Sequence, residues 1–351
     1  MFSCQRFQIG DKQLHRSGEL FVIAEIGLAH EGSLGMAFSM VDAAASAGVD
    51  AVKFQTHLAE HEGTSREKFR VPVFPQDATR SDYWRRTAFT LDQWMKLAEH
   101  ARSRGVLFMS SPFSSQAVQW LSQCEVPAWK LASGELTNYP MIEEMCQTGK
   151  PILLSSGMSS WQELDETIAF IEQNGGAYGV FQCTSSYPCP PRQWGLNVID
   201  QMRERYDCPI GLSDHSGTVV PSLAAIARGA TMFEVHMTFS KRQFGPDSKS
   251  SLTVDELAQL VGSARMLSLA MAHPVDKDLV ASQSGELRAL FTKSIVAARS
   301  LPQGHELARG DLAFKKPGDG ISAKHFQTLV GKRLNRDVPA DHLFAVDDIQ
   351  E

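Results

Sequence analysis

Residues 209–236, PIGLSDHSGTVVPSLAAIARGATMFEVH, contain two short apolar runs that each end in a histidine. The runs PIGLSDH (209–215) and MFEVH (232–236) have the length of buried strands, and the segment between them has the apolar spacing of a helix. Parallel strands need such a helical crossover because their ends point the same way. This stretch therefore predicts a strand–helix–strand unit with chemically active side chains at the strand ends.

The same unit recurs along the chain. Short apolar runs end in a polar or ionisable residue at eight places: Glu25, Gln55, Ser111, Ser133, Ser155, Cys183, His215 and His236. Helical periodicity follows most of them, at 34–47, 91–104, 114–123, 140–148, 160–173, 196–206, 219–228 and 254–271. Eight such units predict a (β/α)8 barrel, a fold whose active site lies at the C-terminal ends of the strands.

The chain is longer than one barrel requires. It has 351 residues, whereas a barrel of this kind takes roughly 250. We expect a barrel domain over 1–285, a linker near 272–290, and a small module of short strands and turns over 286–351. The charged, aromatic stretch 57–90 interrupts the alternation and is interpreted either as a substrate lid or as a solvated surface excursion.

Composition excludes several classes of function. The formal net charge of −6 argues against general binding to nucleic acid or to a membrane surface. No apolar run approaches the length of a membrane span, and the N-terminus lacks the apolar core of a signal peptide. The six cysteines form no CxxC pair, which is typical of reduced thiols in a cytoplasmic enzyme.

His215 and His236 are the candidate metal ligands. They end neighbouring predicted strands about 4.8 Å apart, so both imidazoles can reach one divalent ion such as Mn²⁺, Fe²⁺, Zn²⁺ or Co²⁺. Water and substrate oxygens would fill the remaining positions. The alternative is a pair of histidines that are hydrogen-bonded within the barrel.

Two lysines on predicted strands indicate an anion site. Lys53 and Lys130 point into a packed barrel only if they have an anionic partner. With Ser133, Ser155 and Ser213 they would form a pocket for a phosphate or a carboxylate. The alternative is that either lysine reaches solvent from the barrel wall.

Glu25 and Glu135 fall on the same catalytic face. A carboxylate beside a metal-activated carbonyl could hold sugar hydroxyls or transfer a proton. Equally, either glutamate could serve as a structural counter-ion for Lys53 or Lys130.

Several of these segments together resemble one enzyme family. They include IAEIGLAHEGSLGMA (23–37), AWKLASGELTNYP (128–140), QCTSSYPCPP (182–191), GLSDHSGT (211–218) and FGPD (244–247). In this order they are similar to the sialic acid (N-acetylneuraminate) synthase family. The segment KSIVAARSLPQGHEL (293–307) and the residues after it resemble the antifreeze-like (SAF) domain of these enzymes.

The resemblance implies a reaction and a set of roles. Phosphoenolpyruvate would condense with an N-acylated hexosamine of the N-acetylmannosamine type, giving a nine-carbon 2-keto acid and phosphate. It implies that His215 and His236 bind the metal, with Mn²⁺ expected and Mg²⁺ or Co²⁺ as alternatives. The residues implied around phosphoenolpyruvate are Lys53, Ser111, Lys130, Ser133, Ser155, Tyr187 and Ser213. Those implied to face the sugar, the metal-bound water or the attacking water are Glu25, Gln55, Glu135 and Asp247.

The resemblance also implies a homodimer that exchanges its C-terminal modules. In the family an arginine of the module reaches the N-acyl group of the sugar in the partner subunit, and Lys316 stands at that position here. Lysine lacks the planar fork of arginine, which leaves the acceptor sugar open. The alternative acceptors are N-acetylmannosamine 6-phosphate and a diacetamido-trideoxyhexose leading to a legionaminic- or pseudaminic-type acid. The alternative functions are a synthase of seven- or eight-carbon keto acids and a non-catalytic glycan-binding protein.

Overall fold

A ring of parallel strands forms the centre of the first of two units into which the chain divides, Met1–Ala272 and His273–Glu351. The structure is a computed structural model that describes residues 2–64, 66–69 and 76–350. The strands are β3 (Phe21–Gly27), β4 (Ala51–Thr56), β5 (Leu107–Pro112), β6 (Trp129–Leu131), β7 (Ile152–Ser155), β8 (Tyr178–Cys183), β9 (Ile210–Asp214) and β10 (Met232–Thr238). They pair in the order β5-β4-β3-β10-β9-β8-β7-β6, and β11 (Leu252–Thr253) pairs with β10. The predicted eight-stranded barrel is confirmed.

The two ends of this order, β5 and β6, lie next to each other. No backbone ladder joins them within the described part of the chain. The ring is therefore complete in space, with one seam that lacks hydrogen-bonded pairing.

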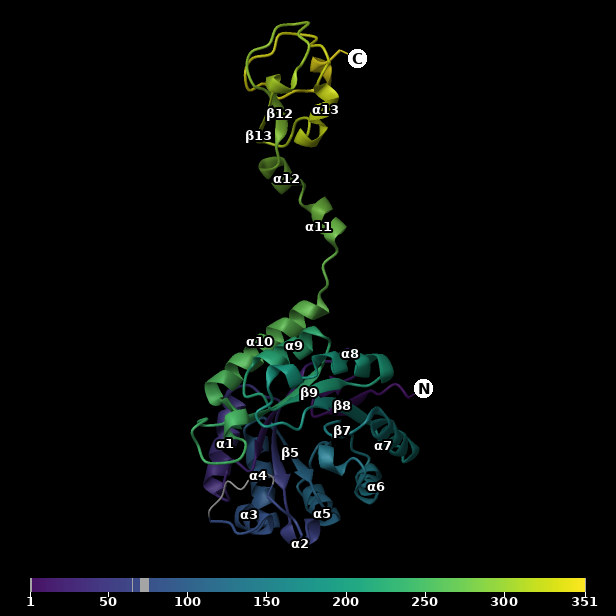
Figure 1. The fold of residues 1–351 in the computed structure, drawn as a ribbon, viewed down its shortest axis with the longest axis vertical. Coiled ribbons are helices and arrows are strands. Elements are labelled where there is room, and N and C mark those ends of the chain that lie inside the picture. The colour runs from purple at the N-terminus through teal and green to yellow at the C-terminus, as the bar shows by residue number, and fades with distance from the viewer. Residues whose placement is uncertain (1, 65, 70–75, 351) are drawn as a thin grey trace. The chain divides into compact units, whose positions relative to one another are not determined.

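Helices surround the strands, as Figure 1 shows in purple to green. They are α1 (Leu34–Ser46), α4 (Leu91–Ser103), α5 (Ser115–Gln123), α6 (Tyr139–Gln147), α7 (Trp161–Gln173), α8 (Leu196–Arg205), α9 (Val220–Ala227) and α10 (Val254–Ala272). Ser33, Thr90, Ser114 and Ser160 start four of these helices because each side chain accepts a hydrogen bond from a backbone N–H of the first turn. A search of the described helices finds none with the length and apolar character that crossing a membrane requires.

An N-terminal hairpin closes the end of the barrel opposite the predicted site. Strands β1 (Phe7–Ile9) and β2 (Lys12–Leu14) pair in antiparallel fashion. Ile9 and Leu14 are fully buried and pack with Phe21 and Met232, the first residues of β3 and β10. The apolar plug therefore lies at the strand N-termini and leaves the C-terminal ends for polar side chains.

The interruption at 57–90 folds back onto the barrel. It contains α2 (Ala59–Glu62) and α3 (Arg80–Thr87), while its residues 70–75 lie outside the described residues. Tyr83 and Trp84 are buried with Leu28 and Ala59. The described part of the interruption is thus packed against the barrel domain through an apolar cluster of its own.

The second unit is small and rich in turns. The stretch expected as a linker carries α11 (Lys277–Gln283) and α12 (Gly285–Phe291). Strands β12 (Ser294–Ala297) and β13 (Leu312–Lys315) pair in antiparallel fashion, and α13 (Phe326–Leu329) follows. Ile295, Leu301, Leu334 and Phe344 form part of its separate core.

This unit contains an internal duplication. The segments PQGHELARGDL (302–312) and PADHLFAVDDI (339–349) share a Pro-x-x-His-x-x-Ala-x-x-Asp pattern. Their backbones are related as well, because Leu301 and Val338 donate N–H to one another's carbonyl at 2.9 Å in both directions. Each copy buries its aspartate, Asp311 or Asp348, behind the histidine of the same segment.

Candidate active site

Polar side chains from the strand C-termini surround one cavity of about 610 Å³ in the first unit. Six of the predicted site residues line it: Gln55, Ser133, Glu135, Tyr187, His236 and Asp247. The described part of the 57–90 interruption forms another portion of its lining through Glu62, Glu67, Phe69, Arg80, Tyr83 and Trp84. This segment is therefore a wall of the cavity and not a detached surface excursion.

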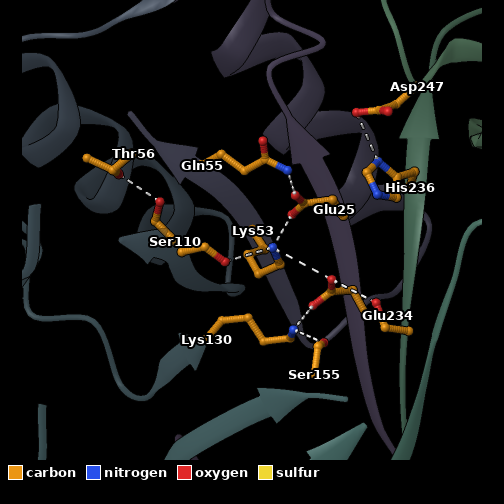
Figure 2. A network of polar contacts seen from close by, with 12 residues as sticks. Glu25, Lys53, Gln55, Thr56, Ser110, Lys130, Ser155, Glu234, His236 and Asp247 are labelled. Carbon is orange, nitrogen blue, oxygen red and sulfur yellow. Dashed lines mark hydrogen bonds and ion pairs between the residues drawn. The ribbon is translucent and has the colours of Figure 1, made fainter. Parts of the chain in front are cut away.

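A buried network of charges connects to the cavity through Gln55 (Figure 2). The Gln55 amide donates to Glu25 Oε1 at 2.8 Å, and Glu25 Oε2 lies 2.8 Å from Lys53 Nζ. Lys53 Nζ also donates to Ser111 Oγ at 3.3 Å. Both charged side chains are almost inaccessible to water, so this ion pair lies in a low-dielectric environment.

Glu234 links the two lysines and was not among the predicted site residues. Its Oε1 lies 3.6 Å from Lys53 Nζ, and its Oε2 lies 3.7 Å from Lys130 Nζ. Ser213 donates to Glu234 at 3.3 Å, and Lys130 donates to Ser155 at 2.6 Å. The signal was present in the sequence, because Glu234 precedes His236 by two residues on β10 and alternate strand residues share a face.

Burial and mutual attraction set the protonation of this network. Burial disfavours the Lys53 ammonium, but the carboxylates of Glu234 and Glu25 outweigh burial and raise the pKa of Lys53. Burial also opposes ionisation of Glu234, yet Lys130 and Lys53 lower its pKa. Burial lowers the pKa of Lys130 and raises that of Glu25. Two ammonium groups face two carboxylates, so the base of the site is close to charge balance.

His215 and His236 come together at one edge of the site. Their ring centroids are 5.3 Å apart, and the rings meet edge to face. His215 Nδ1 lies 2.9 Å from the Thr184 carbonyl, and its Nε2 lies 3.0 Å from the Tyr187 hydroxyl. His236 Nδ1 lies 3.9 Å from Asp247 Oδ2.

The chemistry of these two imidazoles fits a divalent ion. Burial and the neighbouring His236 lower the pKa of His215 to about 3, which keeps the ring neutral as a metal ligand must be. The Thr184 carbonyl can hold the proton on Nδ1, so that Nε2, which the Tyr187 hydroxyl contacts here, carries the lone pair that a metal bond would need. In the ranges that the structure describes, no group of three or more His, Cys, Asp or Glu side chains is arranged to hold a metal. An ion here would depend on two imidazoles plus water or substrate oxygens.

The remaining predicted residues lie in three different settings. Glu135 accepts from Asn138 at 2.9 Å, and burial raises its pKa. Glu135 is therefore not the counter-ion of Lys130, a position that Glu234 takes. Ser133 contacts Cys183 Sγ at 3.6 Å. Lys316 belongs to the second unit, where its ammonium lies 4.9 Å from the centre of the Phe291 ring.

His57 is a further cavity residue that the sequence did not single out. Its ring is stacked between those of Trp84 and Phe113, with centroids 5.0 Å and 4.1 Å away. Its Nδ1 lies 2.6 Å from Glu62 Oε1, and its Nε2 lies 3.2 Å from Gln55 Oε1. The 57–90 segment thereby contacts the same glutamine that holds Glu25.

Comparisons with known proteins agree with this arrangement. Residues 40–276 match the model of the NeuB family, and residues 292–350 match that of the SAF domain. The chain is 30% identical to the N,N'-diacetyllegionaminic acid synthase of Campylobacter jejuni, over 92% of this chain and 98% of that protein. It is 32% identical to the human N-acetylneuraminate-9-phosphate synthase, over 90% of this chain and 88% of that protein.

A solved structure gives the same result. The N-acetylneuraminic acid synthetase of Leptospira borgpetersenii superposes with a TM-score of 0.71 and 27% identity, covering 81% of this chain and 96% of that one. The family match spans most of the barrel, and the second match spans the module after it. The chain is therefore an enzyme that belongs to the NeuB family of sialic and related nonulosonic acid synthases and ends in a SAF domain.

Proposed function

We propose that this enzyme condenses phosphoenolpyruvate with an N-acylated hexosamine of the N-acetylmannosamine type and releases phosphate. One observation carries the proposal: Lys53 and Lys130 are buried within reach of serine hydroxyls at the base of a site that opens, through Gln55, into a sugar-sized cavity. Ammonium and hydroxyl donors match the oxygens of a phosphate and a carboxylate.

The reaction joins C3 of phosphoenolpyruvate to the aldehyde carbon of the open-chain sugar. Water adds to C2, the C2–O bond to the phosphate breaks, and inorganic phosphate leaves. Lys53 and Lys130, with Ser111, Ser155 and Ser213, bind the charged groups of phosphoenolpyruvate. A divalent ion at His215 and His236, for which Mn²⁺ is our choice, supplies a Lewis acid for the aldehyde oxygen.

Other residues handle the sugar and the water. Glu135 and Asp247 line the cavity and accept hydrogen bonds from sugar hydroxyls. Gln55 holds the Glu25 carboxyl, whose pKa burial raises, beside Lys53. A carboxyl of raised pKa suits proton transfer to or from the attacking water.

The anion assignment is tested by Lys53→Met and Lys130→Met. Each should raise the KM for phosphoenolpyruvate by roughly ten- to a hundredfold, since each removes a charge-assisted contact from a buried site. The KM for the sugar should change far less. Lys96→Met, at an exposed lysine of α4, is the matched control. Equal effects on both substrates would contradict the assignment, and phosphate release without any sugar would contradict the condensation.

The metal assignment is tested by His215→Ala and His236→Ala. Both should lose Mn²⁺ binding, measured directly by calorimetry, together with turnover. His100→Ala is the control, because His100 pairs with Asp42 on the helical layer. Full turnover after exhaustive chelation would sink the metal proposal.

We also propose a homodimer in which each SAF domain caps the barrel of its partner and presents Lys316 to the sugar. Mixing Lys316→Ala with His215→Ala subunits should restore partial turnover, because mixed dimers contain one site without either lesion. An active monomer truncated near residue 285 would contradict this arrangement.

A further inference from the structure

The relatives leave one property of the acceptor open. A protein named for a 9-phosphate product and one named for an unphosphorylated acid are about equally similar to this chain, at 32% and 30% identity. The charge of the acceptor must therefore be inferred from the cavity itself.

Carboxylates dominate the described lining of the cavity. They are Glu62, Glu67, Glu135 and Asp247, against one guanidinium, Arg80, and two imidazoles, His57 and His236. The rest of the described lining is neutral. A phosphate on the acceptor would bring two negative charges into this surrounding.

Every basic side chain in that lining already lies beside a carboxylate. Arg80 Nη1 is 2.6 Å from Glu67 Oε1, and His57 Nδ1 is 2.6 Å from Glu62 Oε1. His236 lies 3.9 Å from Asp247, and Glu135 adds a fourth carboxylate. Among the described lining residues, each cation therefore lies beside a carboxylate, and Lys316, which the proposed dimer adds, would serve the N-acyl group of the sugar.

The base of the site, below the cavity, is different. There Lys53 pairs with Glu25 at 2.8 Å, but Glu234 lies at the looser distances of 3.6 Å from Lys53 and 3.7 Å from Lys130, and serine hydroxyls accompany both ammonium groups. In the proposed reaction these lysines are occupied by phosphoenolpyruvate, which adds its own negative charge close to the acceptor. A second phosphate would meet that charge as well.

The apolar part of the wall makes the cavity less favourable still for a phosphorylated sugar. Leu28, Tyr83 and Trp84 line the cavity and are buried in one cluster. Apolar surroundings lower the local dielectric, so repulsion between a phosphate and the wall carboxylates is screened less than in water.

We propose that the acceptor of this enzyme is an uncharged hexosamine and that its 6-phosphate is rejected, with the Glu67–Arg80 pair at the wall as the specificity-determining element. This inference rests on the proposed function. It names the class of acceptor that the same site takes.

The experiment compares N-acetylmannosamine, 2,4-diacetamido-2,4,6-trideoxymannose and N-acetylmannosamine 6-phosphate with the full-length enzyme, phosphoenolpyruvate and Mn²⁺. The better uncharged sugar should exceed the 6-phosphate in kcat/KM by roughly a hundredfold or more, because like charges brought together in a site are strongly unfavourable. An equal or higher kcat/KM for the 6-phosphate overturns the inference and leaves the proposed function intact.

Two variants locate the effect. Glu67→Lys should improve kcat/KM for the 6-phosphate by roughly tenfold or more, because it adds a cation and frees Arg80. Glu67→Gln, which frees Arg80 without adding charge, should act in the same direction but less. Glu60→Lys is the matched control. It makes the same change of charge at an exposed residue of α2 that lies outside the described cavity lining. It should not alter the ratio of kcat/KM between the uncharged sugar and the 6-phosphate. A preference that shifts equally in Glu60→Lys overturns the assignment to Glu67.

The two levels of the proposal fail separately. If no sugar supports phosphate release, the proposed function fails, and the inference is then decided by calorimetric binding of the same sugars. Binding of N-acetylmannosamine without binding of its 6-phosphate supports it. Tighter or equal binding of the 6-phosphate, or binding of neither sugar, overturns it.

Discussion

Buried carboxylates occur in both units, but they are held in opposite ways. In the SAF domain, Asp348 accepts hydrogen bonds from the Ala345 N–H, His342 and Arg336, and Asp311 has the corresponding partners in the other copy of the duplication. In the barrel, Glu234 Oε2 accepts no hydrogen bond from the described residues and faces the Lys130 ammonium at 3.7 Å.

This difference in hydrogen bonding distinguishes the structural carboxylates of the SAF domain from the functional carboxylate of the barrel. A carboxylate with several donors is satisfied by the fold and stabilises it. Glu234 lies 3.7 Å from Lys130, which donates to Ser155, so Lys130 is able to bind another anion, whereas Lys53 is held more tightly by Glu25 at 2.8 Å. Substitutions in the two units can test this distinction, and the largest effect is expected at Glu234.

Glu234→Gln should destabilise the protein most. Removing one member of a buried ionic network leaves the other charges uncompensated and costs about 3–5 kcal/mol. Inorganic phosphate should restore more stability to this variant than to the wild type, because an anion replaces the lost charge beside Lys53 and Lys130. Urea unfolding with and without phosphate measures both quantities. A variant as stable as the wild type without phosphate would show that Glu234 is dispensable.

Asp348→Asn should lower the free energy of unfolding of the SAF domain by about 1.5–3 kcal/mol, since it weakens hydrogen bonds made to a buried charge. Asp311→Asn is its internal match and should cost a similar amount. Neither loss should respond to phosphate. Unfolding of the SAF domain, followed by amide exchange in the full-length protein, provides the measurement. Strong rescue by phosphate would erase the contrast between the two units.

Glu25 of the barrel and the two buried aspartates of the SAF domain should contribute to stability with opposite dependence on pH. In the SAF domain burial opposes ionisation, but His305 and His342, with backbone N–H groups and arginines, lower the pKa of Asp311 and Asp348. Their contribution is therefore complete above the unfolded carboxyl pKa of about 4 and is lost as pH falls through the lower folded value. Burial raises the pKa of Glu25, so its contribution to barrel stability weakens as pH rises through that folded value.

Amide exchange recorded from pH 7 to pH 3 in each unit can detect this contrast. Protection of the SAF domain should hold down to about pH 4 and then fall. Glu25→Gln should remove the dependence expected of the barrel. A barrel profile that is identical in Glu25→Gln and the wild type would contradict the prediction.

The smallest effect is expected at the outer partners of the buried aspartates. The side chains of Arg299 and Arg336 are 61% and 59% exposed, so solvent screens their attraction to Asp311 and Asp348. Arg299→Ala and Arg336→Ala should each cost about 0–1 kcal/mol, measured by the same unfolding experiment. A loss as large as that of Asp348→Asn would show that the arginine, and not the inner donors, satisfies the carboxylate.

Much of the barrel could be predicted from the sequence because its signals are local. Gln55, Ser111 and Ser155 lie in or at the end of strands where the apolar runs place them, and His215 directly follows β9. The period of each run and its following helix determine these positions without knowledge of tertiary contacts.

The parts that escaped prediction depend on contacts between distant segments. Glu234 becomes a site residue only because Lys53 and Lys130 reach it from β4 and β6. His57 becomes a site residue because the chain folds back within the 57–90 segment and brings the Trp84 ring onto the His57 ring. The hairpin that closes the barrel floor is too short to give a clear periodic signal.

The seam between β5 and β6 has a mechanical consequence. Strands joined by a ladder cannot separate without breaking backbone hydrogen bonds, whereas separating β5 from β6 breaks no ladder between described residues. Ser111 at the end of β5 and Ser133 just after β6 lie on opposite sides of it. Of the contacts between neighbouring strands around the ring, the one that these two hydroxyls flank is thus the one held by side-chain packing without a backbone ladder in the described part of the chain.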